Sequence, residues 1–463
     1  MRIYNTLSKK IEEFIPNNKE YVSMYTCGPT VYNYAHIGNL RTYIFEDILE
    51  KGLSFLGYNI KRVMNITDVG HLTSDADTGE DKMIKGAKKE GKTPQELAEF
   101  YTKAFFDDLD KLNIKKPEIV SKATEHVSDY IKVIKVLLDK GYAYKSGGNI
   151  YFDISKAKDY YKLSGKNEEE LIVGARDDVS LDDSKRNPYD FALWFTKSKF
   201  DDQDQKWDSP FGVGYPGWHI ECSTLASIYL GEYLDIHCGG VDNIFPHHTN
   251  EIAQSEAYFG HKWCNYFVHG EHLNDKDGKM SKSKGEFLTL KLLEEKGYNP
   301  LVYKYFCLGS HYRKQLVFSY DSLELAKNAY EKLRNKTSSL VDDGDIDLII
   351  VNKYKNVFSD AISNDLNTSL MLTCVYDILK EECNNSTKRE VIRLFDEVLG
   401  LDLLTKLEKE TSVSEEYILE QIELRKQAKL DKNYALADSI RDNLLKNGVK
   451  LIDKVDGTSY EII

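Results

Sequence analysis

The stretch VSMYTCGPTVYNYAHIGNL, residues 22–40, contains the strand, turn and helix start that decide the fold class. Its first four residues form a short run typical of a strand, and Gly28-Pro29 ends that run. An amphipathic helix pattern follows, with apolar residues at intervals of four: Leu40, Ile44 and Ile48. The stretch therefore predicts a strand, a turn and a helix, which is the opening of an α/β unit.

Three further strands are predicted along the chain. Residues 63–66 follow Gly57 after a crossover of typical length, so the first two strands are expected to be parallel. Residues 233–236 and 266–268 read as two more short strands around a helix. Between these α/β halves, roughly residues 119–205 combine a helical pattern with an acidic stretch, Asn167 to Asp183. We predict an α/β fold whose parallel sheet carries this region as an insertion.

The last third of the chain is predicted to be helical. Apolar residues after about residue 320 recur at spacings of three and four, as in Leu323, Ala326, Ala329 and Leu333. Strand signals disappear there until the end, which favours a helix bundle. A chain of 463 residues is also too long for one core, and suggests roughly three units of about 150 residues.

Composition narrows the class of protein. The sequence contains no run of 18 apolar residues and no long apolar stretch near its N-terminus, so we expect neither membrane spanning nor secretion. Its seven cysteines are odd in number and never spaced C-x-x-C, which favours a reducing cytoplasm. The formal net charge of −13 argues against general affinity for nucleic acid, so a nucleic-acid partner would need a local basic surface.

The octapeptide GAKKEGKT, residues 86–93, fits the pattern of a phosphate-binding P-loop. That motif needs a buried strand before its first glycine, whereas the preceding residues 75–85 are rich in acidic side chains. Thr93-Pro94 followed by Gln95-Glu96 instead resembles the N-cap and first turn of a helix. We interpret the match as accidental.

A second phosphate site is suggested by two separate segments. His36 and Gly38 stand at the start of the first helix, where free N–H groups attract phosphate. Lys279 and Lys282 belong to KMSKS, in a polar, glycine-bounded segment that is expected to be a loop. A capping histidine and a solvated charged turn explain these features equally well when each is taken alone.

Together the motifs resemble those of the class I aminoacyl-tRNA synthetases. HIGN and KMSKS resemble the two signatures of the class. YTCGPTVYNYAHIG, GWHIECS, FPHHTNEIAQSEA and the tail DKNYALADSIRDNLLKNGVKL are similar to the cysteinyl-tRNA synthetase family. The likeness extends over nearly the whole chain, from Asn5 to Thr458.

The resemblance implies a Rossmann-like catalytic domain in two halves, residues 1–118 and 206–300, with the lysine loop in the second half. The connective insertion would occupy residues 119–205. A stem-contact region, 301–345, and a helical anticodon-binding region, 346–463, would follow. The implied activity is ATP-dependent activation of L-cysteine, with Mg²⁺ accompanying ATP, and transfer to the 3′ end of tRNA(Cys). We also expect a cytoplasmic monomer without membrane contact.

The resemblance further implies one zinc ion per chain that binds the sulfur of the substrate cysteine. Cys27, Cys222, His247 and Glu251 match the family's ligands. From the residues alone, His247 and Glu251 share one helix face, but ligands spread over more than 200 residues do not form a local zinc motif. Without the family, buried cysteines and a surface ion pair would be the preferred interpretation.

The resemblance also implies the remaining site residues, each from its position in a motif that matches the family. Gly28, Thr30 and Trp218 match the amino-acid pocket, and the loop DIHCGGVDN matches the ribose and adenylate site. His36, Lys279 and Lys282 would stabilise the transition state. The implied contacts to ATP or substrate complete the set: Gly38, Asn39, His237, Gly239, Gly240, Asp242, Met280, Ser281 and Ser283.

Four positions depart from the family pattern. Asn39 replaces a histidine, His71 stands where acidic residues are usual, Cys238 replaces a glycine and Tyr460 replaces a tryptophan. His71 is hypothesised to compensate for the ring missing at Asn39. Two rival functions remain: a related ligase that joins cysteine to an amino sugar, and a silent tRNA-binding relative. The helical region after residue 320 disfavours the first, and the retained lysines and zinc positions disfavour the second.

Overall fold

The structure is a computed structural model that describes residues 1–69, 83, 86–87, 90–165, 184–197, 205–275, 278–279, 287–406, 413–454 and 457–462. The chain divides into two compact units. The first comprises Met1–Leu333 with Leu340–Leu404, and the second comprises Arg334–Ser339 with Thr405–Ile463. Each unit is described by itself.

A five-stranded parallel sheet forms the centre of the first unit, in the order β11-β10-β3-β4-β5. The strands are β3 (Val22–Thr26), β4 (Ile60–Ile66), β5 (Ile119–Lys122), β10 (Leu234–Gly240) and β11 (Cys264–Gly270). The four predicted strands and their parallel arrangement are confirmed. The Rossmann-like α/β fold class is confirmed with them.

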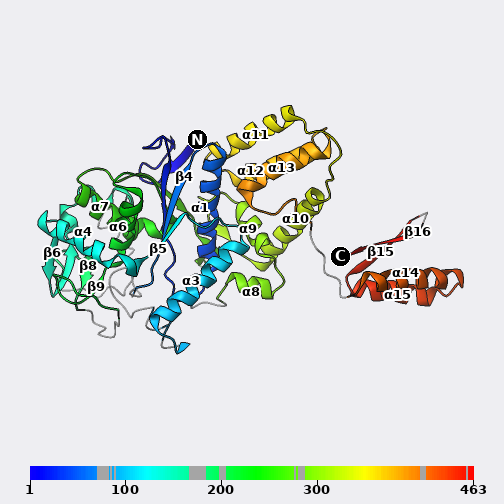
Figure 1. Cartoon of the computed structure of the whole chain (residues 1–463), viewed down its shortest axis with the longest axis horizontal. Helices are drawn as coiled ribbons and strands as arrows, with labels where there is room; N and C mark the ends of the chain where they lie inside the picture. The colour runs from blue at the N-terminus through cyan, green and yellow to red at the C-terminus, as the bar shows by residue number, and fades with distance from the viewer. Residues whose placement is uncertain are drawn as a thin grey trace. The chain divides into compact units, whose positions relative to one another are not determined.

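Helices cover both faces of this sheet because the strands are apolar on both sides. α1 (Ile37–Phe55) packs on the face that carries Met24 and Met64. α6 (Trp218–Leu230) packs on the opposite face, which carries Tyr25 and Val63. Figure 1 shows the two helices on either side of β4. The ends of β3 and β10 and the start of α6 therefore approach one another.

Helix α1 buries an unusual set of charges against the sheet. Arg62 of β4 is fully buried, and its Nη1 lies 2.9 Å from Glu50 Oε2. Its Nη2 lies 3.9 Å from Glu46 Oε2, and neither oxygen of Glu46 has a hydrogen-bond partner. Burial raises the pKa of Glu46 from 4.5 to about 8, against the opposing effect of Arg62.

A Glu46→Gln variant should lose part of the pH dependence of stability. Below pH 4.5 the carboxyl is protonated in both states. As the pH rises to about 8, the unfolded chain releases its proton first, so the folded state loses stability over this window. Relative to wild type, Glu46→Gln should therefore gain a few kcal/mol between about pH 5 and pH 9, measured by urea unfolding.

Glu50→Gln is the matched control for this prediction. It removes a carboxylate of the same helix face from the 2.9 Å ion pair with Arg62. Breaking a buried pair leaves a charge without a partner. This variant should therefore be less stable than wild type throughout the same pH window. If Glu46→Gln lost as much stability as Glu50→Gln, the account of Glu46 would be contradicted.

A second, antiparallel sheet, in the order β6-β7-β8-β9, lies between β5 and α6 in the sequence and extends past residue 205, where the predicted insertion ends. Helix α4 (Val127–Asp139) packs against it and confirms the helical pattern predicted there. The acidic stretch 167–183 lies outside the described residues. The strands of this sheet are β6 (Ala143–Ser146), β7 (Asn149–Phe152), β8 (Phe191–Phe195) and β9 (Tyr215–Pro216).

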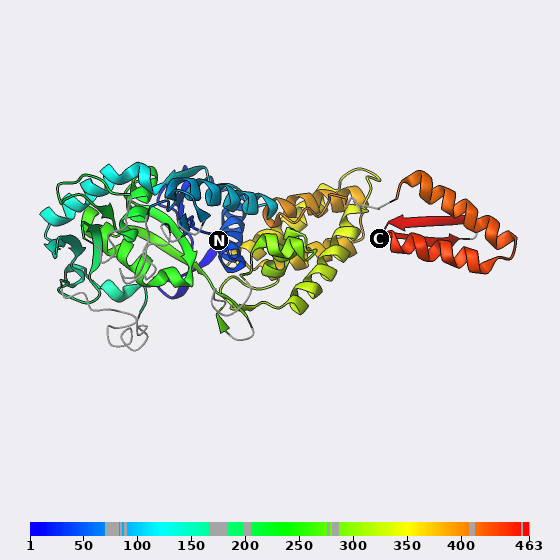
Figure 2. The same cartoon turned by 90° about the horizontal axis from the view of Figure 1, so that it is seen from below.

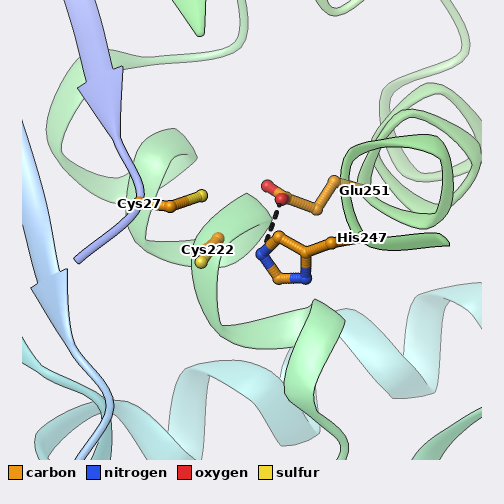
Figure 3. A group of neighbouring side chains, drawn as sticks. All are labelled: Cys27, Cys222, His247 and Glu251. Carbon is orange, nitrogen blue, oxygen red and sulfur yellow. Dashed lines mark ion pairs between the residues drawn. The ribbon is translucent and has the colours of Figure 1, made fainter. Parts of the chain in front are cut away.

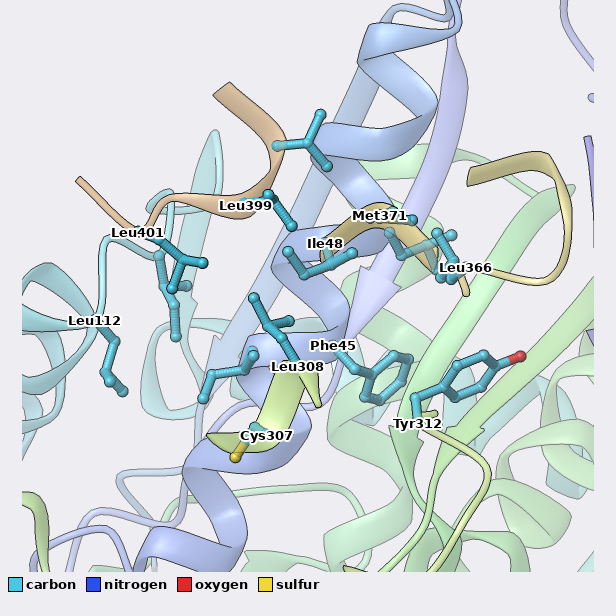
Figure 4. Close-up of a cluster of buried hydrophobic side chains, with 14 of the residues drawn as sticks. Phe45, Ile48, Leu112, Cys307, Leu308, Tyr312, Leu366, Met371, Leu399 and Leu401 are labelled. Carbon is cyan, nitrogen blue, oxygen red and sulfur yellow. The ribbon is translucent and has the colours of Figure 1, made fainter. Parts of the chain in front are cut away.

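The helices after the sheet share one continuous core with α1. Phe45 and Ile48 of α1 pack with Leu308, Met371 and other buried side chains (Figure 4). The helical prediction for this region is confirmed. The elements are α8 (Leu290–Glu295), α9 (Pro300–Leu308), α10 (Tyr320–Ser338), α11 (Leu348–Ser363), α12 (Thr368–Lys380) and α13 (Asn385–Leu399).

Smaller elements complete the first unit. The hairpin β1 (Arg2–Asn5) and β2 (Lys10–Glu13) precedes the sheet, and α3 (Pro94–Lys111) follows β4. A three-stranded sheet joins β12 (Leu273–Asp275) to β13 (Gly278–Lys279) and β14 (Leu316–Val317).

The second unit contains a helix pair and a hairpin. α14 (Glu415–Leu430) and α15 (Tyr434–Lys446) are followed by the antiparallel strands β15 (Val449–Lys454) and β16 (Gly457–Ile462). The strands lie alongside the helices (Figure 2). Within the part of the chain that the structure describes, no helix combines the length and apolarity needed to cross a membrane.

Candidate active site

Four side chains from distant parts of the sequence meet beside the central sheet. Cys27 follows β3, Cys222 lies on α6, His247 lies in the short turn η5 (Ile244–His248), and Glu251 lies on α7 (Thr249–Phe259). Their ligand atoms all lie within 4.8 Å of one another. Figure 3 shows these side chains converging from their separate elements. The structure thus brings together the four residues expected to bind metal.

The chemistry of this group suits a divalent cation. Cys27 is half-buried, and the other three side chains are almost fully buried. His247 Nε2 lies 3.0 Å from Glu251 Oε1. Burial raises the pKa of the Cys27 thiol well above its usual range, and Cys222 adds to this increase. Two protonated thiols beside an imidazole and a carboxylate become soft anionic ligands once a metal ion displaces their protons.

A second group of potential ligands overlaps the first. Cys27, His237, His248 and Glu251 also have ligand atoms within 4.8 Å of one another. His248 Nε2 lies 3.3 Å from Cys27 Sγ. His248 was not predicted as a site residue from the sequence, although it forms the His-His pair of FPHHTNE with His247. The geometry therefore allows two ligand sets with two shared members.

Buried histidines extend from this group in both directions, and sequence reasoning missed His219 and His269 as well as His248. His219 Nδ1 lies 2.9 Å from His247 Nδ1. On the other side, His248 Nδ1 lies 2.9 Å from His269 Nε2. Burial lowers the pKa of His269 to about 3, so this ring is neutral at physiological pH. His219 and His269 each stand apart from other histidines in the sequence, which gives no signal that their rings contact this group.

The residues expected in the amino-acid pocket adjoin the same group. The ring of Trp218 stacks on His247, with centroids 4.0 Å apart and an angle of 23°. Gly28 N donates to Asn65 Oδ1 at 2.8 Å, and a Cβ at Gly28 would lie 1.6 Å from the Asn65 carbonyl oxygen. Thr30 pairs with Thr67 in an isolated parallel bridge. Only glycine fits at position 28.

The start of α1 forms a closed hydrogen-bonded turn. His36 is the N-cap, and its Nδ1 accepts from Gly38 N at 3.0 Å. His36 N donates to Asn39 Oδ1 at 3.3 Å, which completes a capping box. Asn39, which replaces the histidine of the usual signature, thus stabilises the turn. With Nδ1 accepting, the proton of a neutral His36 ring resides on Nε2, which makes Nε2 a donor.

The end of β10 and the turn that follows it place the predicted residues in different surroundings. His237 is fully buried, and its Nε2 lies 3.0 Å from Glu251 Oε2. Gly240 N donates to Asn243 Oδ1 at 3.2 Å, and a Cβ at Gly239 would lie 2.9 Å from the ring of His248. Asp242 Oδ1 lies 3.4 Å from His272 Nε2. The expected contacts of His237, Gly239, Gly240 and Asp242 with substrate or ribose stay predictions.

The lysine motif is described only in part. The backbone of Lys279 belongs to β13 and pairs with Asn274 of β12. Met280, Ser281, Lys282 and Ser283 lie outside the described residues, as does His71. After the motif, Thr289 forms an antiparallel bridge with His36, and Ile37 N donates to Leu288 O at 3.0 Å. Backbone contacts thus connect the chain that follows the motif to the turn at His36.

The P-loop-like octapeptide has the structure expected of an accidental match. Gly86 and Ala87 are helical. Thr93 is the N-cap of α3, Pro94 stands at its first position, and Thr93 forms a capping box with Glu96. The described residues here, Met83, Gly86 and Ala87, are thus helical, whereas a P-loop requires a strand to lead into its first glycine.

The comparisons with known proteins agree with this architecture. The family model "tRNA synthetases class I (C) catalytic domain" matches residues 13–328. The methionyl-tRNA synthetase of Mycobacterium tuberculosis, solved in complex with methionyl-adenylate, has a similar fold. Its TM-score is 0.55 with 14% identity, over 82% of this chain and 90% of that one. Fold and family model together define a class I aminoacyl-tRNA synthetase.

Two curated relatives identify the family within this class. The cysteine–tRNA ligase of Treponema denticola is 47% identical over 490 residues, which cover 100% of this chain and 99% of that protein. The cysteine–tRNA ligase of Borreliella burgdorferi is 45% identical over 481 residues, with the same coverage. The chain belongs to the cysteine–tRNA ligase family.

Proposed function

We propose that the chain activates L-cysteine with ATP and transfers the cysteinyl group to the 3′ end of tRNA(Cys). The observation that carries this proposal is the meeting of Cys27, Cys222, His247 and Glu251 in a chain that matches cysteine–tRNA ligases along its full length. In the first step the substrate carboxylate attacks the α-phosphorus in line. A carboxylate–phosphorus bond forms as the bond to pyrophosphate breaks, and Mg²⁺ enters with ATP.

These four residues would hold a zinc ion. Two thiols, an imidazole and a carboxylate are the ligand types that zinc accepts in tetrahedral sites. When bound, zinc supplies a soft Lewis acid that favours the sulfur of cysteine over the hydroxyl of serine. Trp218 stacks on His247 and restricts its rotation. Gly28 and Thr30 would shape the pocket, with Gly28 allowing close approach of the backbone.

His36 and the two lysines would act on the phosphates. The Nε2–H of His36 would donate to oxygen that gains charge as the α-phosphorus is attacked. Lys279 and Lys282 would offset the charge of the departing pyrophosphate, supported by Met280, Ser281 and Ser283. Gly38 and Asn39 would keep the turn in shape, and Gly239, Gly240 and Asp242 would approach the ribose.

The other parts of the chain would serve the tRNA. We assign residues 1–118 and 206–300 to the catalytic domain, 119–205 to the connective insertion, 301–345 to stem contacts and 346–463 to anticodon binding. Coverage of 99% of the curated relatives supports this assignment, because a ligase with a small acceptor needs no such extension. Seven free cysteines suit a cytoplasmic protein. We propose a monomer.

The test is exchange of labelled pyrophosphate into ATP, with cysteine or serine as substrate and with bound metal measured in parallel. Exchange with cysteine alone, one zinc per chain and charging of tRNA(Cys) would support the proposal. Exchange without charging would favour a small acceptor. A chain with zinc but no exchange would favour a silent tRNA-binding relative.

A further inference from the structure

The guanidinium of Arg41 holds four backbone carbonyl groups. Arg41 lies on α1 and is 5% exposed. Its Nη1 donates to Glu271 O at 2.7 Å and also to His272 O. Its Nη2 donates to Lys314 O at 2.6 Å and to His311 O at 3.5 Å. One planar group therefore joins α1 to two segments that lie far apart in the sequence.

No acidic side chain forms an ion pair with Arg41 among the described residues. Its charge is instead compensated by carbonyl oxygens. Burying a cation is costly unless it is well hydrogen-bonded, and the four carbonyl groups supply those hydrogen bonds here. The planar fork matches paired acceptors in a way that a lysine ammonium cannot. The contacts of Arg41 therefore indicate that its role is to fix the relative positions of the backbone segments that it binds.

Both segments held by Arg41 lead into the sheet that carries Lys279. Glu271 and His272 directly precede β12, and residues 311–314 precede β14. Leu316 N donates to His272 O at 3.1 Å, and Phe318 N donates to Asn274 O at 2.7 Å. β12 pairs in turn with β13. Arg41 thus fixes the point from which the chain enters the lysine motif.

The chain on the other side of the motif is fastened to the same turns of α1. Leu288 O accepts from Ile37 N at 3.0 Å, and Thr289 bridges to His36. Tyr303 of α9 donates its hydroxyl to Ile37 O at 2.6 Å. Residues 36–41 therefore hold both flanks of the lysine motif.

Tight packing beside Arg41 leaves little freedom for the first flank. The rings of Phe45 and Tyr312 stack, with centroids 5.3 Å apart and an interplanar angle of 13°. Figure 4 shows these two side chains next to each other. A Cβ at Gly270 would lie 2.7 Å from the Phe45 ring. The backbone before Glu271 therefore lies as close to α1 as the ring allows.

We propose that Arg41 is a positioning residue, which sets the register of the lysine motif against His36 by holding the backbone at residues 271–272 and 311–314. This inference rests on the proposed function, because the motif acts on the phosphates only if the chain activates an amino acid. Arg41 would act through Lys279 and Lys282. It would not touch ATP or cysteine.

The kinetic test compares Arg41→Met with wild type in cysteine-dependent pyrophosphate exchange. Misplacing the lysines should lower kcat on the order of 100-fold. The KM for cysteine should stay within about threefold, because the four candidate ligands do not contact Arg41. Wild-type kcat in Arg41→Met would overturn the proposal. Should Arg41→Met not fold, Arg41→Lys keeps the cation without the fork and should also lower kcat.

A chain that already lacks both lysines distinguishes a positioning role of Arg41 from a general loss of activity. In a chain carrying Lys279→Ala and Lys282→Ala, adding Arg41→Met should change kcat by less than about threefold, since the groups it positions are gone. A further 100-fold loss would show that Arg41 acts independently of the lysines. Lys304→Met is the matched control: this buried cation bonds to Asp47 and Asn113 and should leave kcat near wild type.

A readout that needs no activity keeps the inference separate from the proposed function. In Arg41→Met, the amides of Leu316 and Phe318 should exchange hydrogen faster than in wild type, while those of β4 keep their rate. Unchanged exchange at both amides would overturn the inference even if the wild type activates cysteine. Faster exchange in a chain without cysteine-dependent activity would overturn the proposed function while retaining the anchoring role of Arg41.

Discussion

A Cys222→Ser variant should lose its bound zinc and nearly all cysteine-dependent pyrophosphate exchange. Serine keeps the size of the side chain, but its hydroxyl has too high a pKa to become a soft anionic ligand. Without the metal, the pocket has no means of favouring a thiol, so kcat/KM for cysteine should fall on the order of 10³-fold or more. The measurements are metal content per chain and exchange at subsaturating cysteine.

Cys264→Ser is the matched control. Cys264 is buried in the same apolar cluster as Cys222, but it belongs to neither group of potential ligands. This variant should retain one zinc and exchange within about threefold of wild type. Similar losses in both variants would mean that the cluster cannot accept a hydroxyl, and would remove the argument for a metal ligand.

The two overlapping ligand sets can be separated in the same assay. His247→Gln should lose zinc if the set with Cys222 binds the metal, whereas His248→Gln should retain it. The opposite pattern would assign the metal to Cys27, His237, His248 and Glu251.

His36→Asn should separate the two roles of the residue at the start of α1. Asparagine is among the best N-cap residues and can accept from Gly38 N, so thermal stability should stay close to wild type. It lacks the Nε2 donor, so kcat for exchange should fall about 10² to 10³-fold, as expected for loss of one donor to a developing charge.

His36→Ala completes this comparison. It removes the donor and the cap together, so it should match His36→Asn in kcat and also lose about 1 kcal/mol of stability. Near-wild-type exchange in His36→Asn would show that the histidine serves only as a cap.

Local patterns predicted the sheet well because its strands and helices follow ordinary periodicity. The β-α-β unit around Gly28 and the four strands could be located without an alignment of related sequences. Thr93-Pro94 likewise has the capping chemistry expected of a helix start, which explains why the P-loop match is accidental. The hairpin β15–β16 was not predicted, since its strands lie in the second unit after a helical stretch and include many polar residues.

The site could be predicted only with the help of the family. His247 and Glu251 are neighbours in sequence, but nothing local places Cys27 beside Cys222; the pairing of β3 with β10 and the packing of α6 do that. The buried rings of His219, His248 and His269 were missed for the same reason. Arg41 offers no signal either, because an arginine among apolar helix residues resembles an ordinary surface charge until the carbonyl groups around it are known.

The wide separation of the candidate ligands also determines when the site can form during synthesis. Cys27 emerges from the ribosome long before Glu251, and the four side chains meet only when α6, β10 and α7 have packed beside β3. Capture of an ion by all four side chains would therefore follow folding of the catalytic core, unlike in a zinc finger, where the ion drives folding. Cells short of zinc should consequently accumulate a folded, protease-resistant chain that recovers when the metal returns.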